Sequence, residues 1–375
     1  MSEENDSAVM RRIRAVEFYS GIGGMHLALS RSMVSGAVVH AYDWDQAACQ
    51  VYGANYGTNP VERRDISALS GNELAGFDAD LWLLSPSCQP YTVLNPLAKG
   101  AEDPRAQSFI HLMEDALPEL AALGKEPKYM LIENVAGFET SSTRLRVLST
   151  LKALGYATAE FLLTPLQFGI PNSRLRYYLL AKKLPLGFVD KASDLLQRHI
   201  PGSGSNWADP RIAASVTTLP STREVRDYLD FSMQPGSFSI PDRVLEKWGR
   251  LFDIVLPSSQ RTCCFTRGYT KLAERAGSVL QMNEKLDTTT VFDEFLLAQK
   301  MGDPNAVRIL DELRLRYFSP DELLGLFNFT MSTTALESGK PFVWPQNIST
   351  KTRYKLIGNS VNVLVVSQLI NYLFR

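Results

Sequence analysis

The sequence predicts an α/β fold built around a parallel sheet, and two observations predict it. The first half of the chain alternates short apolar runs with amphipathic ones, as in sheets whose strands are joined by crossover helices. At its start, an apolar strand at Arg14–Ser20 leads through a glycine turn, Gly21–Gly24, into an amphipathic stretch at Met25–Met33. This strand, turn and helix are typical of a cradle for a nucleotide-type cofactor.

The other elements of the first half follow in chain order. We expect a helix at 45–56 with Asp45 as its N-cap, and one at 144–154 that Gly155 ends. The remaining predicted elements are a helix at 108–120 and strands at 38–44, 79–84, 128–135, 156–164 and 175–181. The last two strands are expected to form a closing β pair.

After about residue 183 the sequence becomes richer in Pro, Ser and Thr and loses clear periodicity, which indicates a smaller second lobe. We therefore predict a principal domain over 1–185, a smaller lobe over 186–312 and a return to the principal domain over 313–375. Residues 288–306 are expected to be a mobile insertion. The chain ends in a Gly-Asn-Ser turn followed by an apolar helix.

Composition narrows the class of protein. With 375 residues, 45% hydrophobic and 21% charged, the chain is typical of a soluble enzyme. It has no run of about 18 apolar residues and no secretory leader, so we expect no membrane association and an intracellular location, in the cytoplasm or the nucleus. Four cysteines and four histidines, without metal-ligand spacing, predict no bound metal. A net charge of −1 means that any polyanion must bind a local basic face.

The glycine turn has a companion at the end of the second strand. Asp43 there would suit ribose hydroxyls, and Trp44 could stack on adenine. A third candidate contact is Asp65-Ile66-Ser67, after the next helix. A glycine turn is often only a turn, so this pattern alone leaves both interpretations open.

Cys88 lies where an apolar strand runs into a proline-flanked loop, and Glu133 closes another apolar strand. A lone intracellular cysteine is most often a small buried apolar residue. A thiol and a carboxylate beside a nucleotide-type cofactor nevertheless suit pyrimidine methylation. Addition of the thiolate to C6 makes C5 nucleophilic, and a carboxylic acid at N3 offsets the charge that develops.

Six ordered motifs resemble the cytosine-C5 methyltransferases that use S-adenosylmethionine: FYSGIGG, YDWD, SPSCQPYT, IENV, GIPNSRLRYY and IGNSVNV. Within that superfamily the chain most resembles the branch historically called DNA methyltransferase two, through LIENVAGFE, PNSRLRYYLLAKK and CCFTRGYTKL. The resemblance implies a Rossmann-like S-adenosylmethionine-dependent methyltransferase fold with a target-recognition lobe. It also implies methylation of the anticodon-loop cytosine at position 38 of aspartate tRNA.

The resemblance assigns roles residue by residue. The expected catalytic residues are Cys88 as nucleophile, Glu133 as the N3 contact, Arg174 and Arg176. The expected S-adenosylmethionine contacts are Phe18, Ser20, Ile22, Gly23, Gly24, Asp43, Trp44, Asp65, Ile66, Ser67, Ser85, Asn359 and Ser360. The expected substrate contacts are Pro86, Gln89, Asn134, Cys264, Phe265, Thr266, Arg267 and Lys271.

Some of these positions have a second interpretation. Ser87 replaces the proline that usually precedes the nucleophile, and its hydroxyl could bond the sulfur and either retard the thiol or leave it competent. Asn172 stands where many relatives have Gln, as is usual in this branch. The two arginines are either solvated charges on a β edge or, being two residues apart, a pair aimed at one anionic or carbonyl-rich site. Asn359 or Ser360 could simply cap a helix.

The second lobe bears on the substrate. Residues 241–275 carry seven Lys/Arg and four Asp/Glu, an excess of three positive charges, and Phe265, Tyr269 and Tyr354 could stack on unpaired bases. The favoured function is therefore methylation of a tRNA anticodon stem-loop, by a chain that is a monomer by default. The alternatives are a DNA cytosine-C5 methyltransferase, a catalytically silent RNA-binding relative and a nicotinamide dehydrogenase. The dehydrogenase would not explain Cys88-Gln89 or Glu133-Asn134.

Overall fold

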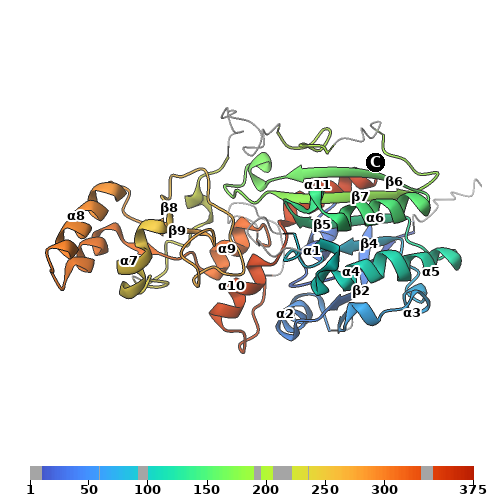
Figure 1. Ribbon diagram of the computed structural model, residues 1–375, viewed down its shortest axis with the longest axis horizontal. Coiled ribbons are helices and arrows are strands. Elements are labelled where there is room, and N and C mark those ends of the chain that lie inside the picture. Colours follow the sequence, from blue (N-terminus) through green and yellow to red (C-terminus); the bar gives the residue numbers. More distant parts are fainter. Residues whose placement is uncertain are drawn as a thin grey trace, which may run out of the picture.

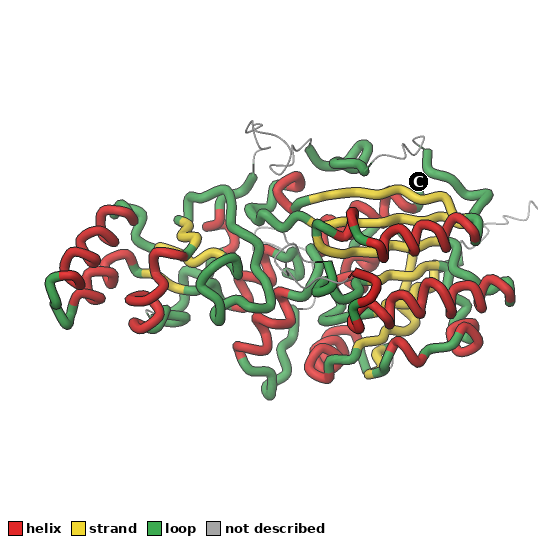
Figure 2. The backbone as a smooth tube through the Cα atoms, in the orientation of Figure 1, coloured by secondary structure: helices red, strands yellow, loops and turns green. Residues whose placement is uncertain are grey.

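The computed structural model describes residues 11–58, 60–91, 100–189, 196–205, 222–234, 236–330 and 341–375. Thr92, the last residue of the SPSCQPYT motif, lies outside these ranges. The described residues form a larger lobe around a seven-stranded sheet and a smaller lobe around a three-stranded one (Figure 1). Figure 2 shows the long strands gathered in the larger lobe, whereas the smaller lobe has short strands among helices and loops.

The large sheet confirms the predicted α/β fold. Its strands are β1 (Ile13–Phe18), β2 (Gly36–Asp43), β3 (Val61–Arg63), β4 (Leu81–Leu84), β5 (Tyr129–Val135), β6 (Tyr156–Leu163) and β7 (Arg176–Lys183). They lie in the order β3-β2-β1-β4-β5-β7-β6, and all pairs are parallel except those of β7 with β5 and with β6. The predicted closing pair is this antiparallel β6–β7 ribbon.

Both faces of the sheet are covered, which explains why its central strands read as continuous apolar runs. In β4, Leu81 and Leu83 pack on one face, and Trp82 and Leu84 pack on the other. The helices that cover the first face are α1 (Gly24–Ser30), α2 (Gln46–Tyr56) and α11 (Val363–Leu373). Those that cover the second are α3 (Gly71–Ala75), α4 (Gln107–His111), α5 (Leu117–Ala122) and α6 (Ser142–Ala153).

Local sequence explains where several helices begin and end. The Asp45 side chain accepts hydrogen bonds from the backbone N–H groups of Ala47 and Ala48, at 2.9 and 3.3 Å, which confirms it as the N-cap of α2. Gly155 follows α6 with φ 73°, a left-handed conformation that favours glycine. The predicted helix at 108–120 is α4 and α5 joined by one π-helical segment, Leu112–Ala116.

The smaller lobe contains β8 (Asp253–Val255), β9 (Ser278–Gln281), β10 (Leu315–Arg316), α7 (Asp242–Trp248) and α8 (Thr288–Lys300). Because β10 pairs with β9, the small sheet extends beyond residue 312, where the sequence places the end of this lobe. The prediction of a mobile insertion at 288–306 is wrong. Asp287 caps α8, and its apolar residues Val291, Phe292 and Phe295 are buried in the core of the lobe.

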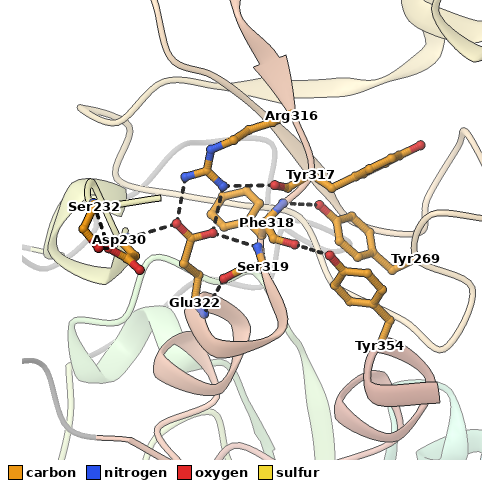
Figure 3. Close-up of polar contacts among 9 residues, drawn as sticks. All are labelled: Asp230, Ser232, Tyr269, Arg316, Tyr317, Phe318, Ser319, Glu322 and Tyr354. Carbon is orange, nitrogen blue, oxygen red and sulfur yellow. Dashed lines mark hydrogen bonds and ion pairs between the residues drawn. The ribbon is translucent and has the colours of Figure 1, made fainter. Parts of the chain in front are cut away.

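A buried polar network joins the two lobes (Figure 3). Arg316 of β10 donates two hydrogen bonds, of 2.8 and 2.7 Å, to the carboxylate of Glu322 in α9 (Pro320–Leu326). Between them, the backbone of Phe318 donates to the Tyr269 hydroxyl and accepts from the Tyr354 hydroxyl, at 2.9 and 2.6 Å. Tyr354 belongs to α10 (Thr350–Gly358), so this network fixes α9, α10 and the Tyr269 segment relative to one another.

The Gly-Asn-Ser turn connects α10 to α11. Neither Asn359 nor Ser360 is the N-cap of α11, because Asn362 has that role and accepts from Val365 N at 3.2 Å. By length and hydropathy alone, residues 350–373 could cross a membrane. Burial explains this composition, since 67% of the most apolar window lies inside the molecule and α11 packs against α1 and β7. Such composition is typical of a core helix.

Candidate active site

A cavity of about 380 Å³ lies at the carboxyl ends of β1, β2, β4 and β5, where α/β sheets bind their ligands. The opposite wall comes from α10 and from Arg267 of the smaller lobe. The predicted site residues that line it are Asp43, Trp44, Ser85, Pro86, Cys88, Gln89, Glu133, Arg174, Arg176, Arg267 and Asn359. Tyr19 and Gly21 of the first motif line it as well, so the cavity unites residues from all six sequence motifs and from both lobes.

Asp43 shapes the cofactor end of this cavity. Its carboxylate accepts hydrogen bonds from Gly21 N at 2.8 Å and from Asp45 N at 2.7 Å, which holds the glycine turn against the end of β2. Burial raises the pKa of this carboxyl group. Gly23 has φ 81°, and a side chain there would meet the ring of Tyr56, so only glycine is compatible with this turn.

The glycine turn also contacts the Gly-Asn-Ser turn from the other end of the chain. A Cβ atom on Gly24 would lie 2.7 Å from Val361 Cγ2 and 3.0 Å from Ser360 Oγ, so α1 begins directly against the segment that joins α10 to α11. Asn359 lines the cavity, and the main-chain oxygen of Ser360 accepts from Arg174. Two motifs more than 300 residues apart therefore form one wall.

The remaining cofactor candidates lie at different depths. Phe18 and Ile22 are fully buried in the core on the two sides of the sheet. Ser85 donates to Tyr19 O at 3.1 Å and lines the cavity. Asp65 caps the short turn that contains Ile66 and Ser67 by accepting from Ser67 N at 3.0 Å. The side chains of Asp65, Ile66 and Ser67 are not among the residues that line the described cavity.

The residues present fit S-adenosylmethionine. The Ser20 hydroxyl is buried beside the glycine turn and has no hydrogen-bond partner among the described residues, which leaves it available for a ligand. Asp43 supplies a carboxylate acceptor that suits ribose hydroxyls. Trp44 is 64% exposed at the rim and can cover an adenine ring, with the Arg63 guanidinium 5.4 Å from the indole centroid.

The nucleophile loop is held by the end of β5. Asn134 Nδ2 donates to Pro86 O at 3.3 Å, and Tyr91 N donates to Cys88 O at 3.0 Å, so the loop turns tightly around the cysteine. Asn134 thus supports the loop from behind. The Ser87 hydroxyl makes no hydrogen bond to the Cys88 sulfur in the part of the chain that the structure describes. Gln89 accepts a hydrogen bond from Arg105.

Cys88 and Glu133 line the same cavity, with Arg176 beside them. Arg176 Nε lies 3.5 Å from Glu133 Oε1. Burial raises the pKa of Glu133, against the opposing effect of the two arginines, which favours the protonated acid. Burial also raises the pKa of the Cys88 thiol, and Arg176 is the main group that opposes this rise.

Arg174 points into a carbonyl-rich site, one of the two arrangements that the sequence left open. Its guanidinium donates to Phe265 O at 2.9 Å, Gly358 O at 3.2 Å and Ser360 O at 2.5 Å, and it packs over the ring of Phe327. It therefore ties the smaller lobe to the turn after α10. Arg174 and Arg176 are not solvated edge charges, because Arg174 is buried and the Arg176 side chain, which lines the cavity, is only 13% exposed.

Cys264 is a second thiol at the site. Arg174 Nη1 and Arg176 Nη2 each lie 3.5 Å from its sulfur. Burial opposes ionisation of Cys264, yet the two arginines hold its pKa below the usual value. The resemblance implied only a substrate-contact role for Cys264, and nothing in the sequence predicted that it would bridge the two arginines.

Three aromatic residues predicted to stack on bases cannot do so here. Phe265, Tyr269 and Tyr354 are at most 4% exposed, and their rings pack edge to face in the core between the lobes. Their spacing looked like a base-stacking surface because sequence does not show which way a ring points. Thr266 begins a loop, and its backbone N–H donates to Ala276 O at the end of that loop. Lys271 belongs to the same loop and lines a separate cavity.

Sequence reasoning missed the contacts of three residues at this site. Gly358 packs directly on the main chain of Thr266 and Arg267, which leaves no room for a side chain. Lys355 forms an ion pair of 2.5 Å with Asp45 across the rim of the cavity. Asn172 is fully buried and donates to Thr262 Oγ1 and Cys263 O, at 3.0 and 3.1 Å. These contacts join distant segments, so no local pattern indicates them.

Known proteins share this architecture. The chain matches the family described as C-5 cytosine-specific DNA methylase over residues 13–375. It is 38% identical over 367 residues to the tRNA (cytosine(38)-C(5))-methyltransferase of Schizosaccharomyces pombe, covering 97% of this chain and 98% of the relative. A DNA (cytosine-5)-methyltransferase of Dictyostelium discoideum is 34% identical, covering 97% and 95%.

A solved structure agrees with these relatives. The crystal structure of the S. pombe Dnmt2 methyltransferase matches with a TM-score of 0.73 at 35% identity, covering 97% of this chain and 98% of that one. The match in sequence and fold extends over both lobes and over the cavity described above. The protein therefore belongs to the C-5 cytosine-specific DNA methylase family, whose activity is methyl transfer to cytosine C5.

Proposed function

We propose that this protein methylates C5 of an anticodon-loop cytosine, at position 38 of tRNA and most suitably of aspartate tRNA, with S-adenosylmethionine as the methyl donor. The observation that carries the proposal is that Cys88, Glu133 and Arg176 meet in one cavity that also contains the cofactor cradle. The similarity to a relative named as a tRNA methyltransferase supports the choice of RNA.

The side chains suit each step at the pyrimidine ring. The Cys88 thiol loses its proton as its sulfur bonds to C6 of cytosine, and Arg176 favours the thiolate electrostatically. Burial raises the pKa of Glu133, which favours the acid form that donates to N3, so the charge that enters the ring with the thiolate is offset there. The electron pair then resides at C5.

When bound, S-adenosylmethionine would supply the methyl group as an electrophilic sulfonium and would leave as the neutral thioether S-adenosylhomocysteine. The ring then loses its C5 proton to a base, and the C6–sulfur bond breaks, which restores the aromatic ring and the Cys88 thiolate. Because burial raises the pKa of Cys88, we expect the resting thiol to be protonated at neutral pH, with ionisation coupled to substrate binding.

Two features favour RNA over duplex DNA. An anticodon-loop base is already unpaired, so its extrusion into the cavity costs less free energy than extrusion from a duplex. Among the described residues, the face of the smaller lobe that adjoins the cavity carries exposed cations, including Arg267. DNA remains the second candidate, because one relative of similar coverage is named as a DNA methyltransferase.

Bisulfite sequencing of tRNA tests this function. After incubation with the protein and S-adenosylmethionine, the wild type should protect cytosine 38 from conversion. Cys88→Ala should abolish that protection and retain cofactor affinity, because Cys88 contacts the base and the cofactor cradle is formed by Asp43 and the glycine turn. Cofactor affinity, measured by calorimetry, shows that the variant is folded.

Duplex DNA in the same assay separates the alternatives. Methyl transfer to DNA alone would overturn the choice of substrate. Unaltered turnover by Cys88→Ala would contradict the mechanism. Cofactor binding without transfer to either nucleic acid would instead support a silent RNA-binding relative, the alternative that Ser87 suggested.

A further inference from the structure

A second cavity, of about 410 Å³, lies in the smaller lobe. Its walls are mainly apolar and aromatic, and they come from α7, the segment after it, and residues 270–274. Trp248 is 42% exposed at this cavity, and Leu272 is 62% exposed. Exposed aromatic and aliphatic groups around a concave site are typical of a surface that binds a flat apolar ligand.

The segment that forms this cavity is rich in exposed cations, of which Lys271 lines the cavity beside the carboxylate of Glu274. Six Lys and Arg side chains from residues 241–275 are exposed and form no ion pair within the described ranges: Arg243, Lys247, Arg250, Arg267, Lys271 and Arg275. Asp242 and Asp253, two of the four acids in this segment, are already paired with Arg308 and Arg261. The segment therefore keeps its excess of three positive charges, with Glu246 and Glu274 as its other two acids, and this excess suits a polyanion.

One loop connects this cavity to the active site. We call residues 266–276 the recognition loop; it is closed by a 2.9 Å hydrogen bond from Thr266 N to Ala276 O. Arg267, at its start, lines the active-site cavity, whereas Lys271 and Leu272 line the second one. Five residues reach at most about 18 Å, so the two cavities lie within a few nucleotides of one another.

The recognition loop is held in a defined shape. The Tyr269 hydroxyl donates to Ser278 O at 2.9 Å and accepts from Phe318 N at 2.9 Å, which anchors the middle of the loop. Thr270 and Arg275 have φ of 68° and 57°, left-handed values that a β-branched residue such as threonine rarely adopts. Such conformations persist where the surrounding structure fixes them, and they cluster at binding sites.

We propose that the second cavity binds a further unpaired nucleobase of the RNA strand that carries the target cytosine. The base stacks on Trp248, and Lys247 and Lys271 pair with its flanking phosphates. Lys247 Nζ already lies 5.0 Å from the centroid of the Trp248 ring, so a cation is placed beside the stacking surface. This inference rests on the proposed function and extends it: the enzyme reads loop RNA at two points.

The combination of groups favours RNA over a protein partner. A base offers two apolar faces with an anionic phosphate on each side, which suits an exposed indole that has Lys247 near its ring and Lys271 in the same cavity. Duplex nucleic acid cannot place a base here, because its bases are already stacked and paired. A docking protein would instead need a broad apolar contact, whereas here Lys271 lines the cavity and Lys247 lies over the Trp248 ring.

Trp248→Ala tests the stacking contact. It should weaken binding of an anticodon stem-loop RNA about tenfold, because stacking on an aromatic ring contributes strongly to single-strand affinity. Trp248→Phe should retain most of the affinity, and Leu297→Ala, which removes another exposed apolar side chain, on α8, should change nothing. Cofactor affinity should stay at the wild-type value in all three.

An abasic scan of the RNA loop locates the stacked base. One abasic position other than the target should weaken binding to the wild type and leave binding to Trp248→Ala unchanged, because the partner is already absent. Equal effects on both proteins at every position would overturn the proposal. So would unaltered RNA affinity of Trp248→Ala.

The salt dependence of RNA affinity tests the phosphate contacts. Replacing Lys247 and Lys271 together by alanine should reduce the slope of log affinity against log salt by about 1.4, or about 0.7 for each contact with a single strand. Lys300→Ala, at the end of α8, should leave the slope unchanged. An equal slope in the wild type and the double variant would contradict the contacts.

The two levels of failure differ. If the wild type methylates tRNA but Trp248→Ala binds it normally, only the second cavity has been misassigned. If the wild type methylates no RNA and its affinity for the stem-loop does not depend on Trp248, the proposed function fails as well.

Discussion

Arg174 and Arg176 lie two residues apart and have different roles at the active site. Arg174 makes three hydrogen bonds to main-chain oxygens and so holds the smaller lobe against the turn after α10. Arg176 lies beside Glu133 and opposes the rise in the pKa of Cys88. The spacing of two residues predicted that both side chains point the same way. Their different roles depend on contacts with Cys264 and Phe265, about 90 residues away, which no local pattern indicates.

Glu17 is a buried carboxyl group beneath the glycine turn. Burial raises its pKa to about 8, although the Tyr52 hydroxyl and the backbone N–H groups of Met25 and His26 donate to it. The Tyr52 hydroxyl lies 3.1 Å from Glu17 and 2.7 Å from His26 Nδ1. Burial lowers the pKa of His26 to about 4, so this imidazole is neutral near pH 7.

Glu17→Gln should remove a pH dependence of stability. The folded-state pKa of about 8 exceeds the ordinary value of 4.5, so the folded protein binds more protons than the unfolded chain between these values. Stability therefore falls as pH rises through this window, by at most about 1.4 kcal/mol per pH unit from this group. Relative to Glu17→Gln, the wild type should lose free energy of unfolding between pH 5 and pH 8.

Urea unfolding of both proteins at the two pH values measures this difference. Glu294→Gln, which changes an exposed glutamate on α8, is the matched control and should track the wild type. A constant difference between the wild type and Glu17→Gln across this range would show that Glu17 does not change its protonation state on folding.

At the scale of elements, the position of α10 depends on a single glycine. Gly358 ends α10 against the main chain of Thr266 and Arg267, at the start of the recognition loop. Main-chain atoms on both sides leave little freedom to move away. The sequence identified this glycine as part of a turn, whereas the structure explains it by close packing between two lobes.

Gly358→Ala should therefore destabilise the protein by about 1–3 kcal/mol, the usual cost of overpacking a well-packed contact. It should also lower tRNA methylation, because the added methyl group displaces the segment that carries Arg267. Gly187→Ala is the control: nothing lies within 4 Å of the added atom. Its effect should stay within about 0.5 kcal/mol, and equal free energies of unfolding for the two variants would contradict this packing argument.

The elements also show what the sequence predicts well. Strands β1, β2, β4 and β5 depend on local apolar runs, and the start of α2 and the end of α6 depend on Asp45 and Gly155, so these elements were found within a few residues. The α8 helix was missed, because Val291, Phe292 and Phe295 bury only one side of it among threonines and acids. Its apolar spacing was present in the sequence, but the surrounding Thr-rich composition outweighed it.

At the scale of the whole molecule, the active site exists only because two lobes meet. Cys88, Glu133 and Asp43 come from the large sheet, whereas Arg267 and Cys264 come from the smaller lobe. The Arg316–Glu322 pair and the hydroxyls of Tyr269 and Tyr354 fix this meeting point (Figure 3). Local sequence patterns indicated the residues from the large sheet. Only the family resemblance indicated Arg267 and Cys264.

The central claim is that Cys88 bonds to C6 of the target cytosine, and a trapping experiment tests it directly. In tRNA carrying 5-fluorocytosine at position 38, fluorine cannot leave C5 as the proton does, so the covalent complex should accumulate. Peptide mass spectrometry should then place the nucleotide on Cys88. Methylation of ordinary tRNA without a trapped complex, or an adduct on Cys264, whose pKa the two arginines hold low, would contradict the account.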